Sequence, residues 1–147
     1  MMTFENTGLK TSSEGKEKMK ILTLIARLLL GLVFFVFGLN GFLNFLSMGP
    51  MPTGLAGQFI GALFVSHYLW VIAALQIAGG AMLLVNRFVP LGLTLLGPVI
   101  VNILCYHVFL TAMGWPLALA VTILWFIVFY SRRQYFSGIF VQQTADK

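Results

Sequence analysis

Charged residues are scarce in this sequence. Asp, Glu, Lys and Arg together make up 9% of the 147 residues, whereas soluble domains contain about 25%. None of the four occurs in residues 28–86 or in residues 88–131, and hydrophobic residues make up 59% of the chain. This composition excludes a water-soluble globule and an intrinsically disordered chain. It predicts an integral membrane protein.

Cysteine is almost absent too, since Cys105 is the only one. A single thiol excludes an internal disulfide, a CxxC dithiol oxidoreductase and a cysteine zinc site. The sequence contains two histidines, His67 and His107, and axial ligation of a haem by this pair is the least favoured interpretation of them. We predict no metal site and assign no catalytic residue, which argues against a stand-alone enzyme.

The net charge of +5 does not indicate nucleic-acid binding, because the basic residues flank apolar segments instead of forming a patch on a soluble module. Basic residues are typical of cytoplasmic loops. The connections that follow the first and the third predicted membrane span contain no Lys or Arg. We therefore predict that both termini are cytoplasmic and that the protein lies in the inner membrane of a bacterial cell. The predicted membrane-anchoring residues are Arg27, Arg87, Arg132 and Arg133, with the Arg27 side chain reaching the lipid headgroups.

The two uncharged runs are each long enough for two membrane-spanning helices of about 20 residues. Short connections make neighbouring spans antiparallel, so the predicted fold is an all-α four-helix bundle. Residues 55–66 form either a short interfacial helix or the first turns of the second span. The predicted spans are residues 20–46, a second helix that ends at residues 86–87, then residues 90–112 and residues 117–130, with a Pro- and Gly-rich break at residues 47–54.

The predicted spans define one membrane domain, residues 19–136, between two polar tails. Residues 1–18 lack hydrophobic periodicity and are predicted to be irregular, as is the short tail of residues 137–147. Within the domain, Gly31 and Gly38 are seven residues apart and predict a close-packed helix contact instead of a ligand site.

Polar side chains inside the spans are the candidates for function, because they are costly in hydrocarbon and usually face the protein interior. At about 1.5 Å rise per residue, most of them fall in the half of the membrane opposite the cytoplasm. We therefore predict a pocket there, where Asn40, Asn102 and His107 converge. The structural alternative is that the same groups only hydrogen-bond between helices. The candidate ligand-binding residues are Asn40, Gln76, Asn102, Tyr106 and His107.

Two strings resemble the DoxX family of small bacterial membrane proteins with four spans. They are RLLLGLVFFVFGLNGFLNF, residues 27–45, and VNRFVPLGLTLLGPVIVNILCYHVFL, residues 85–110. The resemblance covers residues 19–136 and extends to Arg27, Asn40, Asn102 and His107. Many members have Glu where this chain has Gln76, and an amide does not titrate. The resemblance implies a redox context, since some members resemble a small membrane subunit of thiosulfate:quinone oxidoreductase.

Three functions are compatible with these observations. The first is a membrane subunit of a redox assembly that holds a quinone-like amphipathic molecule, with lipid and a partner subunit or a second copy as its partners. The second is a non-catalytic scaffold or assembly factor in which the intramembrane polar residues are structural. The third, a transporter for a small solute, is the least favoured, because the spans are few and show no repeat.

Overall fold

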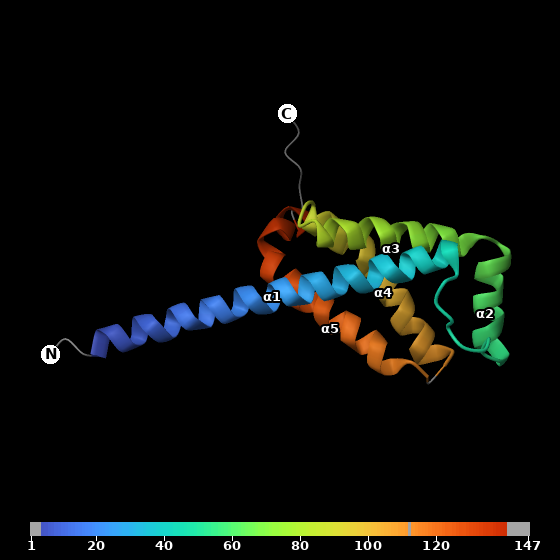
Figure 1. The fold of residues 1–147 in the computed structure, drawn as a ribbon, viewed down its shortest axis with the longest axis horizontal. Coiled ribbons are helices and arrows are strands. Elements are labelled where there is room, and N and C mark those ends of the chain that lie inside the picture. Colours follow the sequence, from blue (N-terminus) through green and yellow to red (C-terminus); the bar gives the residue numbers. More distant parts are fainter. Residues whose placement is uncertain (1–3, 112, 141–147) are drawn as a thin grey trace, which may run out of the picture.

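The structure is a computed structural model that describes the backbone of residues 4–111 and 113–140 and the side chains of residues 13–111 and 113–139. It is helical, and no strand occurs in the described ranges (Figure 1). The elements are the α-helices α1 (Phe4–Leu43), α2 (Gly54–Val65), α3 (Tyr68–Leu84), α4 (Val89–Phe109) and α5 (Trp115–Arg132) and the 3₁₀ helix η1 (Arg133–Phe140).

Three helical stretches of the described chain are long and apolar enough to cross a membrane, namely Ser13–Leu43, Val89–Phe109 and Trp115–Ile139. A fourth span results if α2 and α3 are counted together, although these two helices meet at an angle of 83°. The composition and the helices thus agree on a small multi-pass membrane protein.

Helix α1 is longer than the sequence predicts at its N-terminal end. Residues 4–18 are helical and continue the apolar helix, whereas we expected an irregular tail. The segment contains no proline, and extending an existing helix adds one hydrogen bond for each residue fixed. Figure 1 shows this part of α1 projecting well beyond the other helices. In the C-terminal tail, residues 137–140 belong to η1, and the rest lies outside the described residues.

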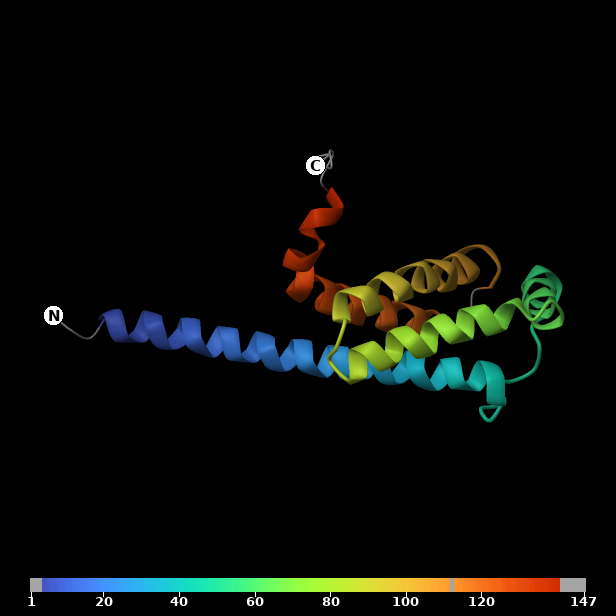
Figure 2. The ribbon, with the colours of Figure 1, turned by 90° about the horizontal axis from the view of Figure 1, so that it is seen from above.

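The break between α1 and α3 contains a separate short helix, which is the first of the two alternatives for residues 55–66. Helix α1 ends at Leu43 because Asn44 is left-handed, with a φ of 48°, a conformation that asparagine tolerates better than most residues. Helix α2 ends before His67, which is also left-handed, with a φ of 59°. The chain turns at this residue, so α2 lies across the end of the other helices (Figures 1 and 2).

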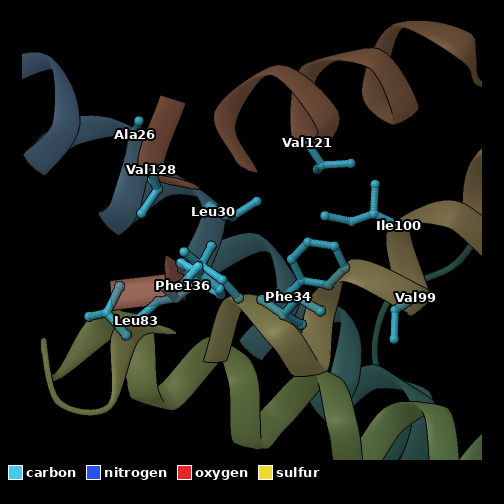
Figure 3. Packing of buried hydrophobic residues seen from close by; sticks show 12 residues of the cluster. Ala26, Leu30, Phe34, Leu83, Val99, Ile100, Val121, Val128 and Phe136 are labelled. Atoms are coloured by element: carbon cyan, nitrogen blue, oxygen red, sulfur yellow. The ribbon is translucent and has the colours of Figure 1, made fainter. Parts of the chain in front are cut away.

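The remaining helices pack in a closed order, with α1 and α4 each in contact with both α3 and α5 (Figure 2). Sequence neighbours α3, α4 and α5 are antiparallel, because Gly79 of α3 meets Gly92 of α4 and Trp125 of α5 meets Leu93 of α4. The buried cluster between them contains Leu30 and Phe34 of α1 (Figure 3). The cluster also includes Leu83, Leu93, Leu96, Ile100, Val121, Val128 and Phe136.

Glycines bring α1 and α3 together at main-chain distance, as the Gly31 and Gly38 spacing predicts. A Cβ atom built on Gly80 would lie 2.7 Å from the Phe35 nitrogen and 2.8 Å from the Gly31 carbonyl oxygen. A Cβ atom on Gly38 would lie 2.9 Å from the Ala73 carbonyl oxygen. Small residues allow such approaches between membrane helices. No side chain larger than hydrogen fits at these positions without a shift of one helix.

Candidate functional site

The imidazole of His107, in the last turn of α4, is half-buried. Its Nδ1 atom lies 2.8 Å from the carbonyl oxygen of Ile103, one turn earlier. A carbonyl oxygen only accepts hydrogen bonds, so Nδ1 carries a proton and donates it. In the neutral imidazole, Nε2 is then left with a lone pair and acts as an acceptor.

Aromatic rings surround His107 on two sides. The Tyr106 ring meets it edge-on at 5.4 Å between centroids, and the Trp115 ring lies at 6.2 Å. Tyr106 in turn contacts Phe59 of α2 at 5.9 Å. The ring series therefore joins α2, the end of α4 and the start of α5, three elements that converge on one end of the molecule. We call this the His107 end.

The acceptor nitrogen of His107 faces Gly114, in the turn between α4 and α5. A Cβ atom at Gly114 would lie 2.6 Å from Nε2, and Gly114 has a φ of 87°. Both facts require glycine there, since a side chain would collide with the ring and would strain the left-handed backbone. Glycine therefore lets the turn pack directly against the ring, and Nε2 keeps some exposure, since no fully buried polar side-chain atom of the described residues lacks a partner.

Asn40 is 8% exposed, and its side chain caps the end of α1. Its Oδ1 atom accepts a hydrogen bond from the Leu46 amide at 2.6 Å, while its carbonyl oxygen accepts from the Asn44 amide at 2.9 Å. The last carbonyls of a helix lack partners within the helix. Asn40 thus fixes the segment that leaves α1, and its bond is local, whereas the structural alternative predicted a bond to another helix.

The other predicted site residues are dispersed. Asn102 is exposed, and Gln76 is half-buried on α3. Within the described residues, no hydrogen bond or ring contact joins Asn102 to Asn40 or to His107. Tyr106 is the one predicted site residue in ring contact with His107. A single pocket shared by Asn40, Asn102 and His107 stays a prediction.

Arg27 is placed differently from our expectation of a side chain that reaches the headgroups. It is 6% exposed, and its Nη1 donates to the carbonyl oxygen of Leu83 and, at 3.4 Å, to that of Leu84. These carbonyls belong to the last turn of α3, where the helix dipole favours a cation, and the Leu83 carbonyl also accepts a hydrogen bond from the Asn86 amide at 3.3 Å. Because α1 and α3 are antiparallel, the first turns of the α1 span lie beside the last turn of α3. The predicted antiparallel order of the spans was therefore the sequence signal that could have placed Arg27 beside Leu83.

The other predicted anchoring residues lie where α3 and α5 end, and we call this region the arginine end. Arg87 and Arg133 are exposed, and Arg132 is half-buried. The Arg87 guanidinium lies 6.0 Å from the centre of the Phe88 ring. Contact of these side chains with headgroups stays a prediction.

Trp125 of α5 makes a hydrogen bond to α4 that the sequence analysis did not predict. Its indole nitrogen donates to the carbonyl oxygen of Leu93 at 3.0 Å, and its ring stacks on Phe129 at 4.9 Å. Pro98 lies inside α4 one turn further on.

The described residues contain no group of three or more His, Cys, Asp or Glu side chains able to hold a metal ion.

No family model matches the chain, and neither the curated proteins nor the solved structures include a similar protein at a significant level. The resemblance to the DoxX family consequently rests on the two sequence strings alone.

Proposed function

We propose that the chain is a DoxX-type membrane protein with four spans, the second of which is α3 preceded by the tilted helix α2. Contacts of α1 and α4 with both α3 and α5 support a four-helix bundle. The arginine end lies in the cytoplasm of a bacterial cell and the His107 end on the other side of the inner membrane, in keeping with the excess of basic residues at one end.

Cysteine labelling tests this orientation. Cys105 is first replaced by Ser, and Ser47→Cys and Arg132→Cys are then introduced one at a time into the full chain. A membrane-impermeant maleimide added outside spheroplasts should label the cysteine at position 47 and spare the one at position 132. The opposite pattern would reverse the proposed orientation, and labelling of both from one side would contradict four spans.

The His107 end, in this proposal, binds a quinol-type amphipathic molecule for a redox assembly. The observation that carries it is the bond between His107 Nδ1 and the Ile103 carbonyl, which leaves Nε2 as an acceptor. A quinol hydroxyl donates a hydrogen bond, whereas a quinone carbonyl only accepts one. Through this acceptor nitrogen His107 therefore favours the reduced form, and the rings of Tyr106 and Trp115 supply apolar contacts typical of ligand sites. No redox step is assigned to the chain itself.

The direct test is equilibrium binding of a short-chain benzoquinol and of its quinone to the full-length protein in nanodiscs. The quinol should bind more tightly than the quinone, and His107→Leu should abolish that preference. His67→Asn is the control, because His67 is exposed, its side chain makes no comparable bond to a carbonyl oxygen, and asparagine tolerates the left-handed backbone at this position. Equal binding of quinol to His107→Leu and to the unaltered protein would refute the site.

A scaffold or assembly factor is the second candidate function, and it is favoured by Arg27 and Asn40. Both side chains were candidates for contact with ligand or lipid, and both hydrogen-bond to main-chain groups of this chain. If a partner subunit co-purifies with His107→Leu as well as with the unaltered protein, and no quinol binds to either, the scaffold function is correct.

A further inference from the structure

An apolar groove runs between the projecting part of α1 and the second half of α5. Met19 and Leu22 line it on α1, and Ile123, Phe126, Ile127 and Tyr130 line it on α5. Its volume is about 360 Å³, which falls within the range of small-molecule sites. In Figure 1, α5 meets α1 at an angle beside the projecting segment, so one flank of the groove is α1 alone.

A fixed cation lies next to this groove. The Arg133 guanidinium lies over the ring of Tyr130, with Cζ 4.2 Å from the ring centre, and its Nη1 donates to the Tyr130 carbonyl at 3.1 Å. A guanidinium has five N–H donors, so this arrangement orients the group while leaving other donors for a ligand. Tyr130 is therefore shared between the apolar wall and the cation.

The chain offers few anions to neutralise this cation. The sequence contains no Asp or Glu between Lys18 and Ala145, and Arg133 forms no ion pair within the described residues. Arg132 directly precedes Arg133 and adds a second positive charge at this end of α5. A guanidinium pairs well with the oxygens of a phosphate group. An apolar groove that ends at such a cation matches the two halves of an anionic phospholipid.

We infer that this groove binds one anionic phospholipid, with an acyl chain against Leu22, Ile123 and Phe126 and the phosphate on Arg133. The site is separate from the His107 end, so it does not depend on the proposed quinol site. It also gives Arg133 a different role from Arg87, which does not line this groove and whose guanidinium lies 6.0 Å from the centre of the Phe88 ring.

The experiment measures lipid retention by native mass spectrometry of the full-length protein in detergent, with phosphatidylglycerol and phosphatidylcholine supplied in equal amounts. Phosphatidylglycerol should be retained preferentially. Arg133→Gln should lower that preference about fivefold, since one basic residue near an anionic lipid contributes about 1 kcal/mol. Arg87→Gln is the matched control, because Arg87 does not line the groove, and it should lower the preference much less than Arg133→Gln does.

Filling the groove provides a second, independent variant. Ile123 is 57% exposed, so Ile123→Trp is accommodated without disturbing the core, and it should reduce retention of both lipids. Equal losses for Arg87→Gln and Arg133→Gln would show a general surface charge and overturn the inference. A change of oligomeric state in Ile123→Trp, with lipid retention unaltered, would show a second copy in the groove and overturn it too.

Discussion

The α1–α3 contact and the His107 end differ in what fills the space between their elements. Along α1 and α3, main-chain atoms meet at Gly31, Gly38 and Gly80, and the buried Arg27 side chain donates to carbonyl oxygens in the last turn of α3. At the His107 end, aromatic side chains meet across α2, α4 and α5, and an imidazole nitrogen faces a glycine turn. Close main-chain contact leaves no room for a ligand between α1 and α3, which is one reason why the proposed quinol site is placed among the side chains of the His107 end.

Gly80→Ala should have the largest effect on stability, because the added methyl group would meet main-chain atoms of α1 that cannot rotate away. Overpacking of this kind costs about 1–3 kcal/mol, and we expect the upper part of that range. The measurement is reversible unfolding in mixed micelles. Gly97→Ala is the matched control, because its Cβ would lie 3.6 Å from the Trp125 ring, an ordinary contact. Equal stability of the two variants would contradict main-chain contact between α1 and α3.

Arg27→Leu should come next, with a loss of about 1.5–3 kcal/mol, the usual value for a hydrogen bond to a charged group. The Leu83 carbonyl would lose its side-chain donor at the end of α3. The same unfolding assay applies, and Arg87→Leu is the control because Arg87 is exposed. If Arg87→Leu destabilises the protein as much as Arg27→Leu, the burial of Arg27 has no special importance.

Gly114→Ala should have a smaller effect on unfolding, on the order of 1 kcal/mol for a left-handed alanine. Its effect on ligand binding should be larger, because the new methyl group would displace the His107 ring or cover Nε2. Benzoquinol binding in nanodiscs measures this difference. If Gly114→Ala binds quinol with unchanged affinity, Nε2 of His107 is not part of the quinol-binding site.

Gly61→Ala should have the smallest effect, a stabilisation of at most about 1 kcal/mol from helix propensity. Gly61 lies within α2, and a Cβ atom there would meet nothing within 4 Å. Thermal unfolding of the purified protein measures it. A clear loss of stability would place a contact on this face of α2 and make the His107 end more tightly packed than we describe.

The apolar runs and the turn residues predicted most of the helices, because the end of α1 and the starts of α2, α4 and α5 coincide with Asn, Gly or Pro. Pro90 and Pro116 stand in the first turns of α4 and α5, where a missing amide hydrogen costs nothing. The glycine contact was predictable too, since few other reasons place Gly31 and Gly38 on one helix face. The 83° bend at His67 was not, because a left-handed histidine has no sequence signal.

The candidate site was less predictable than the fold. Depth along a helix placed Asn40, Asn102 and His107 in one half of the membrane, but depth does not determine rotation about the helix axis. Asn102 is exposed, and Asn40 binds the Leu46 amide. Our prediction for Arg27 was wrong for a related reason. Its partner is a main-chain carbonyl of another helix, and because every residue has such a carbonyl, the sequence does not show which one a side chain will bind.

The glycine contact between α1 and α3 also has an entropic consequence. Glycine has no rotamers, so bringing Gly31 against Gly80 orders no side chain, whereas a long side chain loses up to about 1.5–2 kcal/mol of rotamer freedom on burial. Lipid tails are as apolar as the helices, so burying surface contributes little to association in a membrane. Because the unfavourable entropy at this contact is small, raising the temperature should weaken it less than a contact between long side chains.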